Sequence, residues 1–521
     1  MLDPQLFSHG TTITSDWLNQ IQNRNSDNYN FFESLSLVEK LDVQVGNLTY
    51  DLSTKLQQFI DEVYTKGGGT IYLPSGKYRL DSSIYMKRGI MLVGTEHAVS
   101  ASQYWETSPE GGIIGASRLY FGNNVTTAGI LFDFQITPRE ARPYGSGLIN
   151  LLVSCTSQPA NTDGVLIRNP PAGEGPFNSG FGSGAVRLIN TSVRGAPRYG
   201  VYVVSTATEK TNVALYRCRI SSNGSHGIYV VYSYDMLIEH TFSFSNGGDG
   251  IRMENTATER VLECDIFSNI GNGITLDGYD GRYENNHIDQ NNGHGIQVKA
   301  TATSITNKSY RIIGGRIAQN GMGADNTYSN IRIEDRSGTL CGNITILGVT
   351  FGTAPQTNAN RLAYCLSSSI LTTQIANKLV ACQIGNSDVK TGNEPLNDAF
   401  WQGTEITGTT DPAGQVYEQK WYPLVAGSGS FWQPNVLRGV KRYVTQNTAA
   451  TTLYGLTAGS SRLTGREYYI LINDTFTGVD FTGTTLKGNG GVDLAAGAST
   501  VGKILHLINV DGTNWACNIL G

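Results

Sequence analysis

The sequence predicts an all-β chain built as a parallel β-helix, a solenoid whose short strands stack coil upon coil. Three observations support this prediction. A phrase that contains a Gly-Ile pair returns four times within residues 223–298, at intervals of 23, 23 and 22 residues, and such a period is typical of solenoids. Polar and apolar residues alternate after each pair, as in a strand with one buried face. The 62 glycines and the low charged fraction of 16% favour β structure rich in turns.

An asparagine stands four residues before each Gly-Ile pair of the repeat. The four are Asn223, Asn246, Asn269 and Asn291. When coils stack at about 4.8 Å, like residues form columns along the rod. Asparagine suits a corner of the coil, because its amide can bond to the backbone and its own backbone tolerates left-handed dihedral angles. We therefore expect an asparagine ladder at one corner.

Similar pairs extend the repeat in both directions, with longer connections between coils. They begin at Gly89, Gly129, Gly164, Gly200 and Asn330. We assign residues 81–392 to the β-helix and expect roughly ten to twelve coils, about 50 to 60 Å long at about 4.8 Å per coil. Glycine-rich stretches such as 169–184 are expected to be loops inserted between coils.

The N-terminal part of the chain precedes the repeat. Residues 1–45 are polar, and we assign them to an N-terminal arm or attachment segment. Residues 46–80 are assigned to a capping helix and a first coil, because one helical face collects Leu52, Leu56, Phe59, Ile60 and Val63. A helix laid across the open end of a solenoid would hide its apolar core and its unpaired strand.

The capping helix runs into GGGTIYLPSGKY at residues 67–78. Together they resemble the opening of the pectate-lyase-like, right-handed β-helix domain of bacteriophage tailspikes and related polysaccharide depolymerases. The resemblance implies an elongated homotrimer that binds a bacterial capsule, O-antigen or exopolysaccharide. It also implies a place in the virion tail after synthesis in the host cytoplasm, with the N-terminus attached to a tail or baseplate protein. The resemblance is weak for the reaction, because lyases, hydrolases, epimerases and inactive adhesins share the fold.

The repeat stops near residue 392. Residues 393–430 contain turn residues and aromatic residues and are assigned to a linker. Short alternating segments such as 467–472 and 503–508 follow, and strands at this spacing indicate a β-sandwich. We assign residues 431–521 to this domain, which resembles the C-terminal domains of tailspikes that close the trimer or bind carbohydrate.

Charge and residue spacing argue against several classes of partner and cofactor. The net charge of −5, without a Lys/Arg cluster, argues against nucleic acid. We find no apolar run long enough for a membrane span and no signal-peptide pattern. Cys218 and Cys264 fall in one inward column, two coil rises apart and too far for a disulfide. No cofactor and no metal site are expected. His226 and His294 are expected at turns or on the wall, because their spacing suits no metal.

Stacking predicts which polar side chains leave the wall side by side. One outward column consists of Tyr229, Arg252, Thr275 and Gln297, and the next consists of Val231, Glu254, Asp277 and Lys299. Glu254 and Asp277 are then neighbours about 5 Å apart at the backbone. That spacing suits the paired carboxylates of a retaining glycosidase, and longer side-chain reach would suit an inverting one. Arg252, Lys299 and the nearby Tyr279 are candidate substrate-binding residues.

A second candidate group is expected on the preceding strand of each coil. One column consists of Arg217, His240, Glu263 and Asn285, and the other of Arg219, Phe242, Asp265 and His287. Glu263 and Asp265 share a coil and could act as one acid and one base. Arg217, His240 and His287 would bind the substrate. Histidine and arginine would also suit a lyase, which abstracts a proton beside a uronate and holds its carboxylate.

Several hypotheses remain open at this point. Outward polar residues of a β-helix are commonly solvated wall, and acids and bases stack favourably across strands. A site between subunits of a trimer is also compatible with the sequence. The expected function is hydrolysis of a polysaccharide by paired carboxylates. The alternatives are a lyase that acts by β-elimination on a uronate-containing glycan, a non-catalytic adhesin, and a secreted pectinase.

Overall fold

The computed structural model describes the greater part of the rod and parts of the C-terminal region. The described residues are 28–95, 116–134, 142–155, 158–168, 186–205, 212–299, 309–323, 328–333, 344–352, 364–368, 378–380, 383–384, 401–402, 405–406, 422–424, 431–432, 442–449, 451–454, 467–481, 486–488, 493–495, 497–499, 501–510 and 514–520. Between residues 364 and 442 only the backbone path is described. The expected loop at 169–184 and residues 1–27 lie outside this set.

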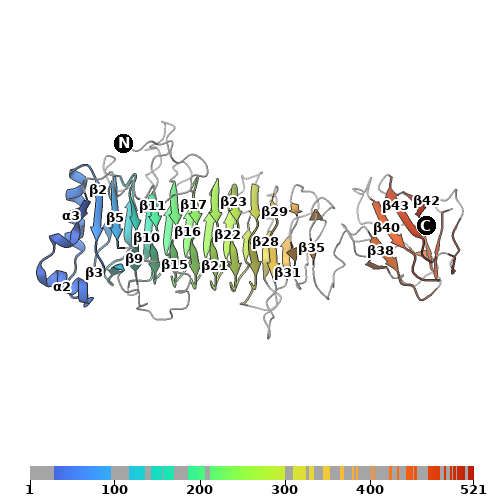
Figure 1. The fold of residues 1–521 in the computed structure, drawn as a ribbon, viewed down its shortest axis with the longest axis horizontal. Helices are drawn as coiled ribbons and strands as arrows, with labels where there is room; N and C mark the ends of the chain where they lie inside the picture. Colours follow the sequence, from blue (N-terminus) through green and yellow to red (C-terminus); the bar gives the residue numbers. More distant parts are fainter. Residues whose placement is uncertain are drawn as a thin grey trace.

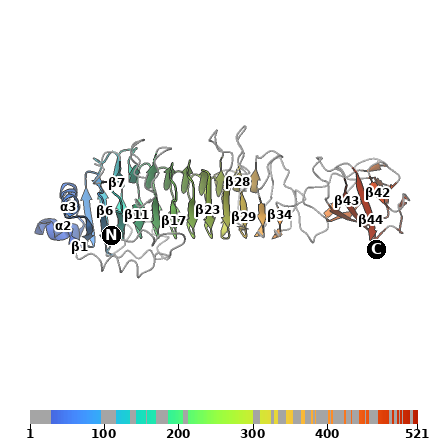
Figure 2. The same ribbon diagram turned by 90° about the horizontal axis from the view of Figure 1, so that it is seen from above.

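The chain forms a rod of stacked parallel strands with helices at one end and a further β domain beyond the other (Figure 1). Three sheets, which we name A, B and C, run along the rod (Figure 2). Following the chain, each repeating coil passes from sheet C to sheet A, then to sheet B, and back to sheet C. The predicted parallel β-helix is confirmed.

The strands are short, and all pairs between neighbouring coils are parallel. Sheet A consists of β1 (Asn28–Asn30), β2 (Gly69–Leu73), β5 (Ile90–Gly94), β8 (Gly147–Ile149), β11 (Val186–Ile189), β14 (Val213–Tyr216), β17 (Leu237–Glu239), β20 (Glu259–Leu262), β23 (Asp280–Glu284), β26 (Ser309–Ile313), β29 (Thr345–Leu347), β32 (Lys378–Val380) and β34 (Trp401–Gln402). Sheet B consists of β3 (Gly76–Leu80), β6 (Ser117–Phe121), β9 (Leu151–Ser154), β12 (Ser192–Arg194), β15 (Arg219–Ser221), β18 (Phe242–Phe244), β21 (Asp265–Phe267), β24 (His287–Asp289), β27 (Arg316–Ala318), β30 (Thr350–Gly352), β33 (Gln383–Ile384) and β35 (Glu405–Ile406). Sheet C consists of β4 (Ile84–Tyr85), β7 (Ala128–Asp133), β10 (Asp163–Arg168), β13 (Val201–Val204), β16 (Ile228–Val231), β19 (Ile251–Glu254), β22 (Ile274–Asp277), β25 (Ile296–Val298), β28 (Ser329–Ile333) and β31 (Tyr364–Ser368).

Strand alternation places the core inside the rod. In β19 the side chains of Ile251 and Met253 are fully buried, whereas Arg252 and Glu254 are partly exposed on the outer face. Inward residues of all three sheets join in one continuous apolar cluster from Phe31 onward. The register between coils follows the sequence repeat, so Tyr229, Arg252, Thr275 and Gln297 align in one column and Val231, Glu254 and Asp277 in the next, as predicted. The expectation that all of these side chains are exposed was wrong for Thr275, Gln297 and Asp277, which are buried.

The predicted asparagine ladder occupies the corner between sheets B and C. Each side-chain amide of the four repeat asparagines donates to the side-chain oxygen of the next, at 2.8 to 2.9 Å. The ladder continues through Asn320, to which Asn291 donates at 2.8 Å. Asn320 follows after 29 residues, so the regular period did not reveal it.

The corner between sheets A and B requires a left-handed backbone. We expected Arg217, His240, Glu263 and Asn285 on a strand, and this was wrong. Their φ angles are 52°, 49°, 52° and 52°, and each stands after a strand of sheet A. A single left-handed residue turns the chain from one strand into the next, which is why the strand pattern of alternating side chains stops there.

One expected coil start was also wrong. Gly89 precedes β5 of sheet A, and the strand of sheet C in that coil is β4. Gly89 has a left-handed φ of 66°, which glycine adopts without strain. A Gly-apolar pair therefore marks a turn followed by a strand, but it does not identify the sheet.

Two α-helices and a 3₁₀ helix cover the N-terminal end of the rod. They are η2 (Phe31–Ser34), α2 (Leu37–Val45) and α3 (Ser53–Thr65). The buried face of α3 includes Leu56, Ile60 and Val63, and these belong to the rod core. Strand β1 pairs with β2, so residues 28–45, assigned above to an arm, contribute to this end of the rod. Neither described helix is long and apolar enough to cross a membrane.

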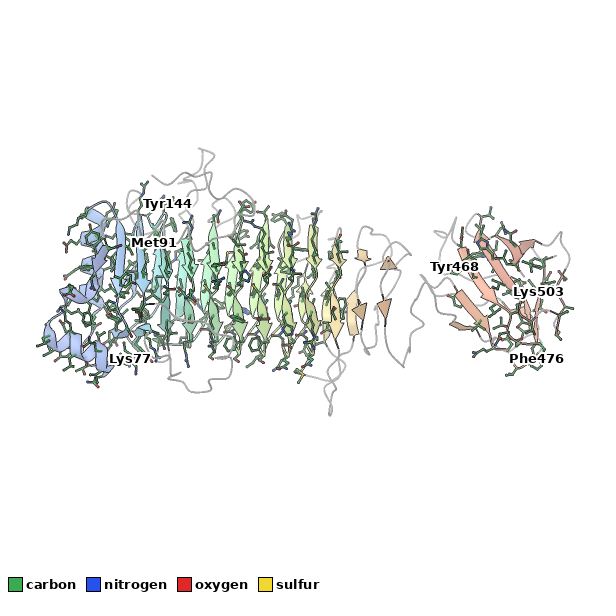
Figure 3. All side chains as sticks on the ribbon, in the orientation of Figure 1. Lys77, Met91, Tyr144, Tyr468, Phe476 and Lys503 are labelled. Atoms are coloured by element: carbon green, nitrogen blue, oxygen red, sulfur yellow. The ribbon has the colours of Figure 1, made fainter. Side chains whose placement is uncertain are left out.

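The C-terminal region contains two further sheets. One consists of β36 (Tyr422–Leu424), β38 (Arg442–Thr445), β40 (Glu467–Leu471), β43 (Ile504–Asn509), β44 (Trp515–Leu520) and β42 (Leu486–Gly488), and the other of β37 (Phe431–Trp432), β39 (Thr451–Leu453) and β41 (Thr477–Val479). Tyr468, labelled in Figure 3, belongs to the core of this domain. Its ring centroid lies 5.4 Å from that of Trp515. The first strands alternate between the two sheets and therefore pair in parallel, which an ordinary antiparallel sandwich does not. Backbone pairing of the rod continues to Ile406.

The cysteines of the inward column are buried as expected. Cys218 and Cys264 are free, and the backbone N–H of Cys218 donates to Thr241 Oγ1 at 3.2 Å. Burial raises the pKa of both thiols to about 12.

Candidate functional site

The two groups of predicted site residues lie on different parts of the rod. Glu254 and Asp277 stand at the ends of neighbouring strands of sheet C and pair in register. Glu263 lies at the corner between sheets A and B, and Asp265 begins β21 of sheet B. Strand β20 of sheet A lies between Glu254 and Glu263 along the coil. The structure therefore does not bring the four acids into one site.

Three tyrosines gather on the outer face of sheet C and at its entry corner. We call Tyr199, Tyr202 and Tyr229 the tyrosine platform. The rings of Tyr202 and Tyr229 are stacked, with centroids 5.2 Å apart, because β13 and β16 pair in register. The ring of Tyr199 lies 5.0 Å from Tyr202 and 4.9 Å from Tyr229. All three rings are half-buried, so they present apolar surface at the wall.

Tyr199 and Tyr202 were not among the predicted site residues. The signal was present, because Tyr202 and Tyr229 both occupy the second position after a coil-starting glycine. The coil between them is 27 residues long, longer than the repeat on which the columns were aligned. Alignment on the glycines alone would have placed the two rings together.

Arg198 lies against this platform. Its guanidinium carbon is 4.9 Å from the ring centroid of Tyr199 and 5.3 Å from that of Tyr202. Arg198 Nε and Nη2 donate to the two carboxylate oxygens of Asp163 at 2.7 and 2.6 Å. Burial raises the pKa of Asp163, whereas the hydrogen bond to Asp163 raises the pKa of Arg198. The bidentate geometry keeps the pair ionised, since neutralising one partner would leave the other charge buried alone.

Glu254 is held at the edge of the tyrosine platform. Arg252 Nε donates to Glu254 Oε1 at 2.7 Å, and the Tyr229 hydroxyl donates to Glu254 Oε2 at 2.7 Å. Burial, and then the bond to the carboxylate, raises the pKa of Tyr229 well above its usual range. Asp277, the predicted partner of Glu254, is buried with 4% of its surface exposed. Hydrogen bonds from Arg252 and Tyr229 thus orient both carboxylate oxygens of Glu254. Arg252 is thereby paired with a carboxylate of its own strand.

A second ladder runs along the corner where each strand of sheet C begins. His226 Nδ1 accepts the backbone N–H of Asp249 at 2.8 Å, and Asp249 Oδ1 accepts that of Asn272 at 2.8 Å. Asn272 Oδ1 accepts the N–H of His294 at 2.7 Å, and His294 Nδ1 accepts that of Ser329 at 2.9 Å. The two histidines therefore have the turn role that was expected.

The ladder also determines the charge of His226. A ring nitrogen that accepts a hydrogen bond carries no proton, so the proton of neutral His226 lies on Nε2. Burial lowers the pKa of His226, which agrees with a neutral ring. Asp249 Oδ2 has no hydrogen-bond partner among the described residues, although Asp249 is only 5% exposed. This oxygen lies 3.6 Å from Arg252 Nη1 and 3.8 Å from His226 Nδ1.

Two further candidates lie near the end of the strands of sheet C. Lys299 follows β25, and its backbone N–H donates to Leu276 beside Asp277 at 2.7 Å. Tyr279 stands in the turn between β22 and β23 with 39% of its surface exposed. Both residues therefore lie on the same side of the rod as Glu254 and Asp277.

The second predicted group forms acid–base pairs between coils. His240 Nδ1 lies 3.3 Å from Glu263 Oε2, and His287 Nδ1 lies 3.4 Å from Asp265 Oδ1. Arg217 is exposed at the same corner as His240, with its guanidinium carbon 5.2 Å from the Tyr216 ring centroid. Such cross-strand pairs are also the arrangement expected of a solvated wall.

His287 has a third neighbour that bears on its charge. Hydrogen bonds to Asp265 and then to Asp289 raise the pKa of His287 to about 9. Arg316 Nη1 lies 2.9 Å from His287 Nε2, and this contact opposes protonation because a guanidinium only donates. The two carboxylates affect the pKa of His287 more than Arg316 does, because Arg316 is itself paired with Asp289 at 3.5 Å. Among the described residues no cluster of His, Cys, Asp and Glu could hold a metal ion.

Comparisons with known proteins agree with the fold. The family model described as "Right handed beta helix region" matches residues 179–337. Mannuronan C5-epimerase AlgE2 of Azotobacter vinelandii is 23% identical over 270 residues, which cover 49% of this chain and 25% of the epimerase. The chain thus spans about a quarter of the length of that curated relative.

Two solved structures of tailspikes are also similar. A tailspike double mutant of E. coli bacteriophage HK620, in complex with a pentasaccharide, has 12% sequence identity and a TM-score of 0.50, covering 86% of this chain and 79% of that chain. Tailspike protein 2 of an Escherichia coli O157:H7 bacteriophage has 16% identity and a TM-score of 0.48, covering 95% of this chain and 62% of that chain. The resemblance to right-handed tailspike β-helices is confirmed as a likeness of fold.

Proposed function

We propose that this chain binds a polysaccharide along the outer face of sheet C and hydrolyses a glycosidic bond there. The observation that carries the proposal is the tyrosine platform, which lies directly beside Glu254 and is hydrogen-bonded to it through Tyr229. Aromatic rings offer an apolar face with a polar tip, and a few oriented polar groups at such a surface provide specificity. The outward side chains of β13, β16 and β19 are partly exposed, so the accessible face spans three successive coils and suits a few sugar units of a polymer.

Glu254 and Asp277 are the proposed pair of carboxylates. They are backbone neighbours on coils that stack at about 4.8 Å, and retaining glycosidases place their two carboxyl groups about 5–5.5 Å apart. Glu254 accepts hydrogen bonds on both oxygens, and protonation would disturb one of them. Glu254 therefore suits the nucleophile. Asp277, which is 4% exposed, suits the acid only if substrate binding uncovers its carboxyl group so that it reaches the leaving oxygen. Asp277 then removes a proton from the water that releases Glu254 from the sugar.

The wider proposal is a phage tailspike depolymerase. The chain would act outside the cell as a homotrimer in the virion tail, on a capsule, O-antigen or exopolysaccharide, with its N-terminus bound to a tail or baseplate protein. The fold similarity and the helices at the N-terminal end support this proposal. A site between subunits would add residues from a second copy to this face.

Proton abstraction beside a uronate is a second candidate chemistry. It is favoured by the epimerase relatives and by the group of His226, Tyr229 and Arg252 on one face. Lyases and epimerases both begin with this step. The backbone hydrogen bond to His226 Nδ1 leaves the proton on Nε2, so this ring would have to change tautomer before acting as a base.

Product analysis tests the proposal. The protein is incubated with a panel of purified bacterial polysaccharides, and the fragments are weighed by mass spectrometry. Hydrolysis adds one water at each cleavage, whereas elimination adds none and leaves an unsaturated uronate that absorbs ultraviolet light. Binding without new reducing ends would identify an adhesin, and the absence of binding to every polysaccharide would overturn the proposal.

A further inference from the structure

Asp249 and Asn272 occupy the same place in successive coils, immediately before the glycine that opens a strand of sheet C. Asp249 Oδ1 accepts one backbone N–H at 2.8 Å, and Asn272 Oδ1 accepts the next at 2.7 Å. An amide therefore performs the hydrogen bonding of this corner as well as a carboxylate does. The fold does not require the negative charge of Asp249.

The second carboxylate oxygen of Asp249 is in an unfavourable environment for a charged group. Asp249 Oδ2 is buried and receives no hydrogen bond from the residues that the structure describes, and such an oxygen costs folding free energy. It points to Arg252 Nη1 at 3.6 Å and to His226 at 3.8 Å. Arg252 in turn lies over the ring of Tyr229, 5.9 Å from its centroid. The carboxylate of Asp249 therefore lies one side chain, that of Arg252, away from the tyrosine platform.

The ionised groups beside the tyrosine platform leave an excess of one negative charge. They are Arg198, Arg252, Asp163, Asp249 and Glu254. Asp163 neutralises Arg198 in the bidentate pair, Glu254 neutralises Arg252, and His226 is neutral, so Asp249 provides the excess. Neither Lys299 nor Arg332, further along the sheet, is without a partner.

We propose that Asp249 is a specificity-determining residue that makes the tyrosine platform select electrically neutral sugar units over uronates. The inference rests on the proposed function and names the class of glycan that the same face binds. A uronate is normally held by a guanidinium that donates two hydrogen bonds, and both arginines here already face carboxylates. A neutral sugar that stacks on the tyrosines meets no like-charge repulsion.

Matched pairs of ligands test this inference. Each uronate-containing polysaccharide is used in its native form and after carboxyl reduction, which converts every uronate into a neutral hexose, and naturally neutral polysaccharides are included. Two unit charges about 6 Å apart in water interact by about 0.7 kcal/mol, equivalent to about threefold in affinity. We expect neutral forms to bind at least about threefold more tightly at low salt, with a smaller preference at high salt.

Two substitutions with opposite effects provide the control. Asp249→Asn keeps the acceptor oxygen of the ladder and should reduce the preference for neutral forms by about threefold. Asn272→Asp adds a carboxylate one coil away and should increase it. If Asp249→Asn fails to fold, as judged by circular dichroism and thermal unfolding, Asn272→Asp still carries the test.

The outcomes separate the two proposals. Tighter binding of native uronate polymers by the unmodified chain, or an unchanged preference in the folded variants, would overturn the role of Asp249. Absence of binding to all forms, neutral and acidic, would overturn the proposed function itself.

Discussion

Asn246 is joined twice to Asn269. The side-chain Nδ2 of Asn246 donates to Asn269 Oδ1 at 2.9 Å, and the backbone N–H of Asn246 donates to the same oxygen at 3.1 Å. Asn269 Nδ2 then donates to Asn291 Oδ1 at 2.8 Å. At the edge of the ladder, Asn223 Oδ1 accepts the backbone N–H of Ala196 at 3.0 Å, where no amide side chain stands. A central asparagine therefore serves more buried groups than the first one.

Replacing these asparagines should reveal that difference. Asn269→Ala leaves two donors of Asn246 without their acceptor, whereas Asn223→Ala leaves one backbone N–H. Each unmet buried hydrogen bond costs about 1–3 kcal/mol, so Asn269→Ala should lower the free energy of unfolding more than Asn223→Ala. Denaturant-induced unfolding of the two variants measures this, and equal, negligible losses would contradict the ladder.

Glu259 should make stability depend on pH. Its side chain is fully buried, and Oε1 accepts from Thr256 at 3.0 Å and Tyr283 at 3.1 Å. Within the described part of the chain, no group donates to Oε2. Burial raises the pKa of Glu259 from 4.5 to about 7. The folded state thus holds more protons than the unfolded state between these values, and stability falls as pH rises through that window.

Glu259→Gln is the matched variant for this prediction. It keeps the shape and removes the ionisation, so it should flatten the pH profile and stabilise the chain at pH 8 by at most about 3 kcal/mol, at about 1.4 kcal/mol per pH unit. Thermal unfolding of both proteins from pH 4 to 8 checks this. Parallel profiles would show that Glu259 is not the titrating group.

Tyr229 should separate binding from turnover. Tyr229→Phe removes the hydroxyl that donates to Glu254 but keeps the ring, so turnover should fall more than affinity. Tyr202→Ala removes one stacked ring, and we expect affinity to fall about two- to tenfold, since an aromatic pair contributes about 0.5–1.5 kcal/mol beyond its buried area. Equilibrium binding and initial rates on the same polysaccharide measure both effects. An equal loss of affinity in the two variants would argue against the platform.

Amide substitutions should locate the catalytic pair. Glu254→Gln and Asp277→Asn keep the side-chain shapes, so binding should persist while turnover falls by several orders of magnitude, because paired groups act as one unit. Glu263→Gln and Asp265→Asn are the controls on sheet B and its corner. If those controls lose activity instead, His240→Ala and His287→Ala should alter the pH profile. A lyase would respond most to the histidines and to Arg217, Arg219 or Arg252.

Near-normal activity in all four amide variants would exclude both pairs. The site would then have to lie elsewhere, and a groove between subunits would be the first place to search.

Light scattering tests the proposed assembly into a homotrimer. A homotrimer should give three times the mass of the chain, and a mass equal to that of one chain would contradict the trimer.

The sequence by itself determined the repeating coil. The spacing of Asn223, Asn246 and Asn269 and the alternation after each glycine specify a strand, its buried side and the stacking of like residues. These features are local, because each coil pairs with the next at nearly the same offset along the chain. For this reason the burial of Cys218 and Cys264 in one column was also predictable.

Only the tertiary structure decided which groups meet on the outer surface. Asp163 and Arg198 are separated by 35 residues, and Tyr202 lies one long coil before Tyr229, yet parallel pairing of the strands places each pair in contact. Strand alternation specifies whether a side chain points into the rod or out of it. When the connections between strands differ in length, however, the sequence does not specify which residue of the next coil lies beside that side chain. The corner position of His240 and Glu263 was hidden for a related reason. A left-handed residue at a turn leaves the polar pattern of the sequence unchanged while it moves the side chain from the face of one sheet to the edge between two.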